Sequence, residues 1–188
     1  MPATEAPFIA GLPWTLRDYL AGPCGLPPGV LEPRGAQELP AVPRRLLAHD
    51  QDMTSTLARH HGGELAVDVL RHEVRGDTYL REVFLRVRPG GSVVEYGVIA
   101  IAQENLPAPV RAAVIGARGP LGGLLHQFAV PFHCAPMGFF EVSSALLPRL
   151  GAVEGPCHGR CARLSTPAGE SLAWAVEILP PLPSSTQP

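Results

Sequence analysis

Hydrophobic and polar residues alternate along residues 77–88, DTYLREVFLRVR, and this period of two predicts a β-strand. One face of the strand would carry Tyr79, Arg81, Val83, Leu85 and Val87. Because this face is apolar except for Arg81, we expect it to enter the core. The opposite face mixes apolar and charged residues, which is typical of a partly solvated surface. Arg81 is thus a single positive charge on the face predicted to be buried.

The last predicted strand, SLAWAVEILP at residues 171–180, carries a single charge of the opposite sign. Both of its faces are apolar except for Glu177. An unpaired charge transferred into a protein core costs several kcal/mol, on the order of the penalties measured for buried ions. The positions of Arg81 and Glu177 therefore need an explanation.

Three explanations remain open at this point. Arg81 and Glu177 could form one buried salt bridge, or either could lie at a strand end in solvent, as the nearby Pro180 suggests for Glu177. Alternatively, both could line a cavity and face a polar ligand, with the small residues Ala173 and Ala175 leaving room for it.

The remaining pattern predicts an α+β fold. Further strands are expected at 64–70, 93–102, 138–147 and 159–165, and short helices at 43–49, 52–62, 107–117 and 120–128. Short turns such as RPGGS favour antiparallel neighbours. We therefore expect one antiparallel sheet with short helices on one face.

Composition divides the chain into three parts. Residues 1–43 are rich in proline and glycine, with one short helical pattern around WTLRDYLAG, and are predicted to pack on or flank the domain. Residues 44–180 carry the strand and helix patterns of the domain itself. The tail at 181–188, dominated by proline and serine, is predicted to be disordered.

Charge and hydropathy exclude several classes of partner. The formal net charge is −2, and the basic residues are scattered rather than clustered, so we expect no nucleic-acid partner. No segment approaches the roughly 20 apolar residues that a membrane span needs. The first residues do not resemble a signal peptide, so we expect a cytoplasmic protein, as a monomer or homodimer.

A metal site is not predicted. The four cysteines include a CHGRC stretch at 157–161, and the segment HQFAVPFHC at 126–134 adds histidines. No CxxC pair repeats at the spacing of a zinc finger, so packed cysteines and partly exposed histidines are favoured.

Four stretches in the same order resemble the chorismate pyruvate-lyase family over about residues 44–180. They are LLAHDQDMTSTL, YLREVFL, GPLGGLL with the nearby FFEV, and HGRCARLSTPAGESLAWAVEILP. The resemblance implies a sheet of about six antiparallel strands, with a buried ligand pocket. Residues 1–43 lie outside it.

The resemblance also implies roles for single residues. Arg81 would bind the carboxylate of an aromatic acid, helped by the backbone N–H groups of Met53 and Leu121. Glu177 would contact the ring hydroxyl at the other end, as an acid, a base or a positioning group. His126 and His133 lie in a segment that departs from the family pattern, and either could reach the pocket, although a surface or packed position is favoured.

The implied activity is that of a carbon–oxygen lyase without metal or organic cofactor. It would release pyruvate from chorismate, or from a close analogue, and give 4-hydroxybenzoate for ubiquinone-type or secondary metabolism. One alternative is a related enzyme that aromatises or dehydrates another cyclic acid. The other is a non-enzymatic module of the same fold that binds an aromatic acid. Effector domains of some transcription regulators have this fold, but residues 1–43 are too rich in proline for a helix-turn-helix.

Overall fold

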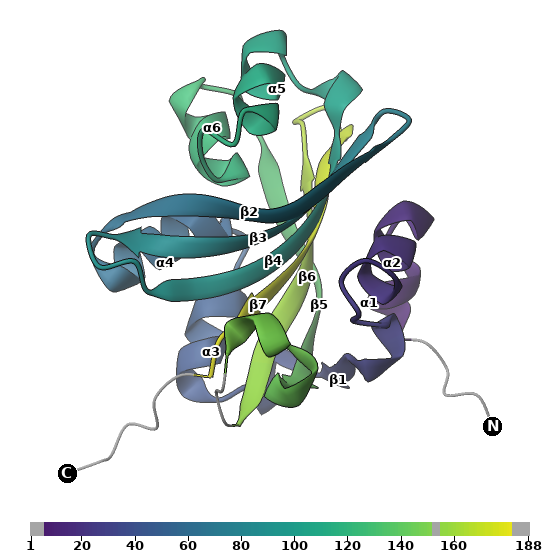
Figure 1. Cartoon of the computed structure of the whole chain (residues 1–188), viewed down its shortest axis with the longest axis vertical. Coiled ribbons are helices and arrows are strands. Elements are labelled where there is room, and N and C mark those ends of the chain that lie inside the picture. The colour runs from purple at the N-terminus through teal and green to yellow at the C-terminus, as the bar shows by residue number, and fades with distance from the viewer. Residues whose placement is uncertain (1–5, 152–154, 182–188) are drawn as a thin grey trace.

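The computed structural model describes residues 6–151 and 155–181 of the 188-residue chain. The described residues contain one antiparallel sheet with the strand order β1-β5-β6-β7-β4-β3-β2 (Figure 1). Its strands are β1 (Glu32–Arg34), β2 (Glu64–Arg75), β3 (Thr78–Arg88), β4 (Val93–Ala102), β5 (His133–Ser143), β6 (Pro156–Ser165) and β7 (Ser171–Leu179). The predicted α+β class with a single antiparallel sheet is confirmed.

Six short α-helices accompany the sheet in the described part of the chain. They are α1 (Pro7–Ala10), α2 (Trp14–Ala21), α3 (Ala41–Leu47), α4 (Met53–His61), α5 (Ala108–Ile115) and α6 (Leu121–Gln127). Single 3-10 turns lie at Pro28–Val30, Ala36–Glu38, Gln103–Asn105, Ser144–Leu146 and Pro148–Leu150. All but residue 181 of the predicted disordered tail lies outside the described residues.

Local sequence explains where α4 begins and ends. The Asp52 side chain accepts a hydrogen bond from the Ser55 backbone N–H at 2.9 Å, which caps the first turn. Gly62 ends the helix in the left-handed conformation, with φ +66°. Asp52 and Gly62 thus bound the helix that the sequence predicts at 52–62, and Met53 is its first helical residue.

One face of the sheet is covered by α3, α4, α5 and α6. Tyr79, Ile101 and Ala173 of this face pack with buried residues of α5 and α6 in one cluster. Leu85 and Leu179 pack with α3 and α4 in another. Figure 1 shows α3 and α4 beside the sheet, and α5 and α6 above β2 in this view.

The prediction that helices cover only one face is wrong. Phe8, Leu16 and Leu20 of α1 and α2 pack on the opposite face, against Leu80 and Phe84 among others. Figure 1 shows α1 and α2 on the far side of the sheet from α3 and α4. The charged residues of β3 made this face look solvated, yet its apolar residues require a cover, which the N-terminal residues provide.

The sheet has seven strands rather than about six because a short piece of the N-terminal region joins its edge. Pro33 pairs with Phe140, so that β1 lies beside β5. A proline is tolerated there because an edge strand can leave one side of its backbone unpaired. The strand predicted at 138–147 begins earlier, at His133, and its interior residue Pro136 lies next to a register shift against β6.

Candidate functional site

A small cavity of about 50 Å³ lies on the helix-covered face of the sheet, against the beginnings of α4 and α6. The strands contribute Arg81, Val83, Leu85, Glu95, Gly97, Val98, Ile99, Leu164, Ala175, Val176 and Glu177. The two helix starts contribute Asp52, Met53, Thr54, Pro120, Leu121 and Gly122. The cavity thus combines a largely apolar lining with four ionisable side chains.

Arg81 is buried in the middle of β3, opposite Ile99 of β4 and His72 of β2. Its side chain is 2% exposed, and neither Nε nor Nη1 has a hydrogen-bond partner in the part of the chain that the structure describes. Burial lowers the pKa of its guanidinium to about 10. Arg81 therefore still carries its charge at neutral pH, and no carboxylate of the described residues forms an ion pair with it.

Glu177 is bonded to Arg160, not to Arg81. Arg160 Nε donates to Glu177 Oε2 at 2.6 Å, across a directly paired position of β6 and β7. A salt bridge between Arg81 and Glu177 was one explanation of the two lone charges, and the structure does not contain it. The Arg160 side chain is fully buried.

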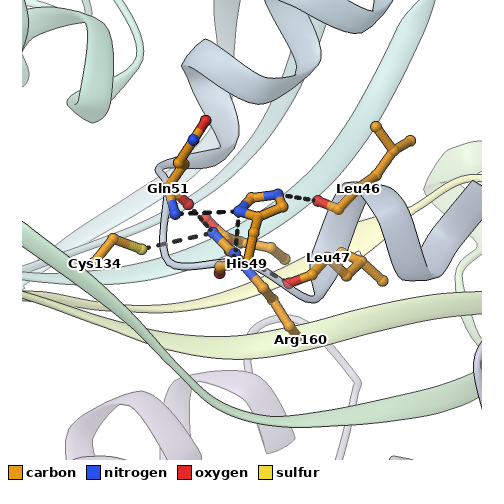
Figure 2. Close-up of polar contacts among 7 residues, drawn as sticks. Leu46, Leu47, His49, Gln51, Cys134 and Arg160 are labelled. Carbon is orange, nitrogen blue, oxygen red and sulfur yellow. Dashed lines mark hydrogen bonds and ion pairs between the residues drawn. The ribbon is translucent and has the colours of Figure 1, made fainter. Parts of the chain in front are cut away.

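Arg160 also holds the segment that joins α3 to α4. Its Nη1 donates to the carbonyls of Leu47 at 3.2 Å and His49 at 3.0 Å, and its Nη2 donates to that of Gln51 at 3.0 Å. Figure 2 shows the guanidinium among these carbonyls, with Cys134 Sγ at 3.6 Å. Arg160 therefore connects the sheet to the residues that immediately precede α4.

The His49 ring reinforces this segment from within. Its Nε2 contacts the Leu46 carbonyl at 2.6 Å, and its Nδ1 accepts from the Gln51 N–H at 3.2 Å (Figure 2). Burial, followed by the charge of Arg160, lowers the pKa of His49. A neutral ring that donates at Nε2 and accepts at Nδ1 fits both contacts.

Glu95 is a further buried carboxyl of the cavity, which the sequence prediction missed. It lies on β4, opposite Leu85, and is 4% exposed. Burial, followed by the negative charge of Glu177, raises the pKa of Glu95 well above its usual range, although Arg160 acts in the opposite direction. Burial therefore favours the uncharged form of Glu95. Its Oε2 has no hydrogen-bond partner among the described residues.

Gly97 shapes the wall of the cavity between Arg81 and Glu95. A Cβ atom at this position would lie 3.1 Å from Glu95 Oε1 and 3.2 Å from Val83 Cγ2. The Glu95 carboxyl therefore lies over the backbone of Gly97. Gly97 is opposite Glu177 on β7 and lies between Glu95 and Ile99 on β4. The cavity-facing charged positions thus follow one another along the sheet, first Arg81, then Glu177, then Glu95.

Met53 and Leu121 are the first residues of α4 and α6, and both are buried. The first N–H groups of a helix have no carbonyl partner inside that helix. Both residues line the cavity, so their positions are compatible with the backbone contacts that the family resemblance implies. Ala175 lines it too, whereas Ala173 lies in the apolar cluster under α5 and α6.

His126 and His133 line a different hollow on the surface. This open pocket measures about 380 Å³ and is shared with Asp50, Gln51, Ser55, Arg59, Phe132 and Cys134. His126 Nε2 lies 3.0 Å from Asp52 Oδ2, and the His126 side chain is 56% exposed. Asp52 lines both hollows, so the contact between His126 and Asp52 lies where they meet.

The described residues contain no cluster of three or more histidine, cysteine or acidic side chains that could hold a metal ion. Cys157 and Cys161 are buried in the apolar cluster on the α1 and α2 face, whereas Cys134 belongs to the opposite face. No helix in the described parts of the chain is long and apolar enough to cross a membrane.

The fold resembles that of solved structures although their sequences are very different. No protein-family model matches the sequence, and no curated protein is similar to it. The structure of PhnF from Mycobacterium smegmatis has a TM-score of 0.54 and 12% identity, over 88% of this chain and 77% of that one. The SA0254 gene product of Staphylococcus aureus has a TM-score of 0.51 and 12% identity, over 72% and 92%.

The likeness shows the class of fold, which is chorismate lyase-like. A ligand-binding domain assigned to a GntR-family transcriptional regulator of Bordetella bronchiseptica matches with a TM-score of 0.46 and 14% identity, over 62% and 83%. The prediction of a lyase is contradicted, because the neighbours whose function is named are regulator domains and not enzymes.

Proposed function

We propose that this chain is a non-enzymatic binding module for a small organic acid, whose carboxylate pairs with Arg81. The observation that carries this proposal is the state of Arg81. It is a charged guanidinium, 2% exposed, with two nitrogens that lack a partner in the described residues and that belong to a cavity lining. A ligand carboxylate would supply the missing acceptors, because a planar guanidinium binds a carboxylate through two parallel hydrogen bonds.

The charges around the cavity support an anionic ligand. Arg160 and Glu177 neutralise one another, and the raised pKa of Glu95 favours its uncharged form. Asp52 is occupied by the Ser55 N–H and by His126. Arg81 is therefore the charged side chain of the cavity whose nitrogens still lack partners among the described residues, and it remains available for a ligand.

An aromatic acid is the ligand that the family resemblance favours, with 4-hydroxybenzoate as the first candidate. The cavity of about 50 Å³ is much smaller than the roughly 300 Å³ at which ordinary ligand pockets begin. Such a ligand therefore requires α4 and α6 to move apart. They contact one another through the pair His126–Asp52, and Gly122 of α6 lies directly against the Asp52 carboxylate.

In this proposal the ligand acts by changing the position of helices rather than by reacting. Binding at Arg81 would move the start of α4, to which Arg160 connects the preceding segment. In a transcription regulator such a movement would be passed to a separate DNA-binding domain. The similarity in fold to regulator ligand-binding domains supports this reading over a catalytic one.

The test is thermal denaturation of the full chain in increasing benzoate and 4-hydroxybenzoate, with chloride at equal ionic strength as reference. Ligand binding to the folded state should raise the melting temperature with ligand concentration. Arg81→Met should abolish the rise. The matched control is Arg88→Met, an exposed arginine at the end of the same strand, which should keep it. An equal rise in wild type and Arg81→Met would disprove the proposal.

A further inference from the structure

Two carboxyls of the cavity, Glu177 and Glu95, could contact the far end of an acid bound by Arg81. They differ in the hydrogen bonds that they already make. Glu177 accepts from Arg160 at 2.6 Å, and this bond is short and charge-assisted. Glu95 Oε2 has no partner among the described residues although the side chain is 4% exposed. A buried polar atom without a partner is costly, which makes Glu95 the group that gains more from a ligand contact.

The position of Glu95 fits this contact. Arg81 is opposite Ile99, and Glu95 is four residues before Ile99 on β4. At the rise of an antiparallel strand, their backbones are separated by about 13 Å along the sheet. The two side chains must span part of that distance, and the Glu95 carboxyl lies over Gly97, which is between them. A small acid admitted by the movement of α4 and α6 would therefore contact Arg81 at one end and Glu95 at the other.

We infer that Glu95, rather than Glu177, contacts the polar end of the ligand, and that this end is uncharged. The ligand class is then a monoanion with a hydroxyl or another neutral hydrogen-bonding group opposite its carboxylate. This inference rests on the proposed binding of a carboxylate at Arg81.

The charge balance excludes a dicarboxylate. Arg81 can neutralise one negative charge, and a second one would lie beside Glu95 and near Glu177. Burial and Glu177 both raise the pKa of Glu95 and so favour its protonated form, which has one O–H donor and one acceptor oxygen. A hydroxyl can use both, whereas a second carboxylate would add a buried, uncompensated charge.

The experiment measures dissociation constants of benzoate, 4-hydroxybenzoate and terephthalate by calorimetry. Wild type should bind 4-hydroxybenzoate about tenfold more tightly than benzoate, as expected for one satisfied buried group. Terephthalate, with its second carboxylate, should bind more weakly than benzoate. Glu95→Leu should reduce the preference for 4-hydroxybenzoate to within about twofold while benzoate still binds.

Two further variants make the result decisive. Glu177→Gln should keep the preference for 4-hydroxybenzoate, and Glu95→Ala replaces the leucine variant if that one does not fold. The inference is overturned if the preference survives in the Glu95 variants, if it is lost only in Glu177→Gln, or if wild type shows none. A failure of the underlying proposal looks different, because then none of the three acids would bind in a way that depends on Arg81.

Discussion

Arg81 and Arg160 lie on the same face of the sheet and are both almost without solvent exposure, yet their surroundings are opposite. Arg160 has a carboxylate, three backbone carbonyls and a thiol within hydrogen-bond distance. Two nitrogens of Arg81 have no partner in the described residues. A buried arginine that is fully bonded stabilises a fold, whereas one that is left unpaired lowers stability and is retained for another reason.

The two buried arginines thus have different roles in the structure. The Arg160 region is built as a rigid connection between β6, β7 and the segment before α4 (Figure 2). Around Arg81, by contrast, two guanidinium nitrogens lack a hydrogen-bond partner among the described residues. Substitution of the two arginines by the same apolar residue should therefore change stability in opposite directions.

The largest effect is expected for Arg160→Met. This change leaves Glu177 buried without its cation and removes the donors of three carbonyls. The free energy of unfolding should fall by about 3–5 kcal/mol, as when one partner of a buried ion pair is removed. Urea denaturation provides the measurement. Arg163→Met, at an exposed position of the same strand, is the control and should change stability much less. A loss below about 1 kcal/mol for Arg160→Met would contradict the conclusion that Arg160 stabilises the connection between the sheet and the segment before α4.

Arg81→Met should have the opposite sign in the absence of ligand. Removal of an unpaired buried charge should raise the free energy of unfolding by about 1–4 kcal/mol, the range seen when buried charged groups are replaced by apolar residues of similar volume. The same denaturation experiment tests it. A destabilised Arg81→Met variant would show that Arg81 has a structural partner. Arg81 would then stabilise the fold, as Arg160 does.

Glu95→Gln should change how stability depends on pH. The pKa of Glu95 is raised in the folded state, so above about pH 4.3, the ordinary value for glutamate, the unfolded chain loses a proton that the folded chain keeps. This contribution to stability is complete below that pH and decreases as pH rises. Glutamine cannot lose the proton, so the melting temperature of the variant relative to wild type should increase between pH 4 and pH 8.

The control for this experiment is Glu104→Gln, which changes a carboxyl outside the cavity lining, in the turn after β4. It should leave the pH profile close to that of wild type. A Glu95→Gln profile parallel to wild type over the whole range would mean that the Glu95 carboxyl titrates normally.

The alternation of residues in β3 and β7 was sufficient to find Arg81 and Glu177, because a period of two assigns each residue to one face. The same reasoning applied to VVEYGVIAIA would have found Glu95, a single charge in an otherwise apolar strand. The partner of each charge could not be predicted, since it depends on the strand order. Glu177 lies beside Arg160 only because β7 is between β6 and β4.

The sequence did not predict that α1 and α2 cover the second face of the sheet, for a related reason. Glu82 shares that face with Leu80 and Phe84 and looks like a solvent-facing charge, but its carboxylate is fully buried. It accepts from the Tyr96 hydroxyl at 2.8 Å and lies 2.7 Å from Arg149 Nε. Contacts between residues so far apart in sequence leave no periodic signal, so the sequence did not show that Glu82 is buried. For the same reason it did not show that the N-terminal helices cover this face of the sheet.

The smallest effect on stability is expected for His126→Ala. Its contact with Asp52 joins α6 to α4, but the His126 side chain is 56% exposed, and exposed ion pairs contribute about 0–1 kcal/mol. The variant should therefore unfold almost as wild type does.

The same variant tests how a ligand enters the cavity. If α4 and α6 must separate before a ligand reaches Arg81, loss of the His126–Asp52 contact should raise both the association rate and the dissociation rate of benzoate. The equilibrium affinity should then stay nearly unchanged. Stopped-flow measurements with His133→Ala as control, a residue of the same surface pocket, would test this. Unchanged rates in His126→Ala would show that the ligand does not enter between the two helices. A change in affinity without a change in association rate would show that His126 contacts the bound ligand and does not control its entry.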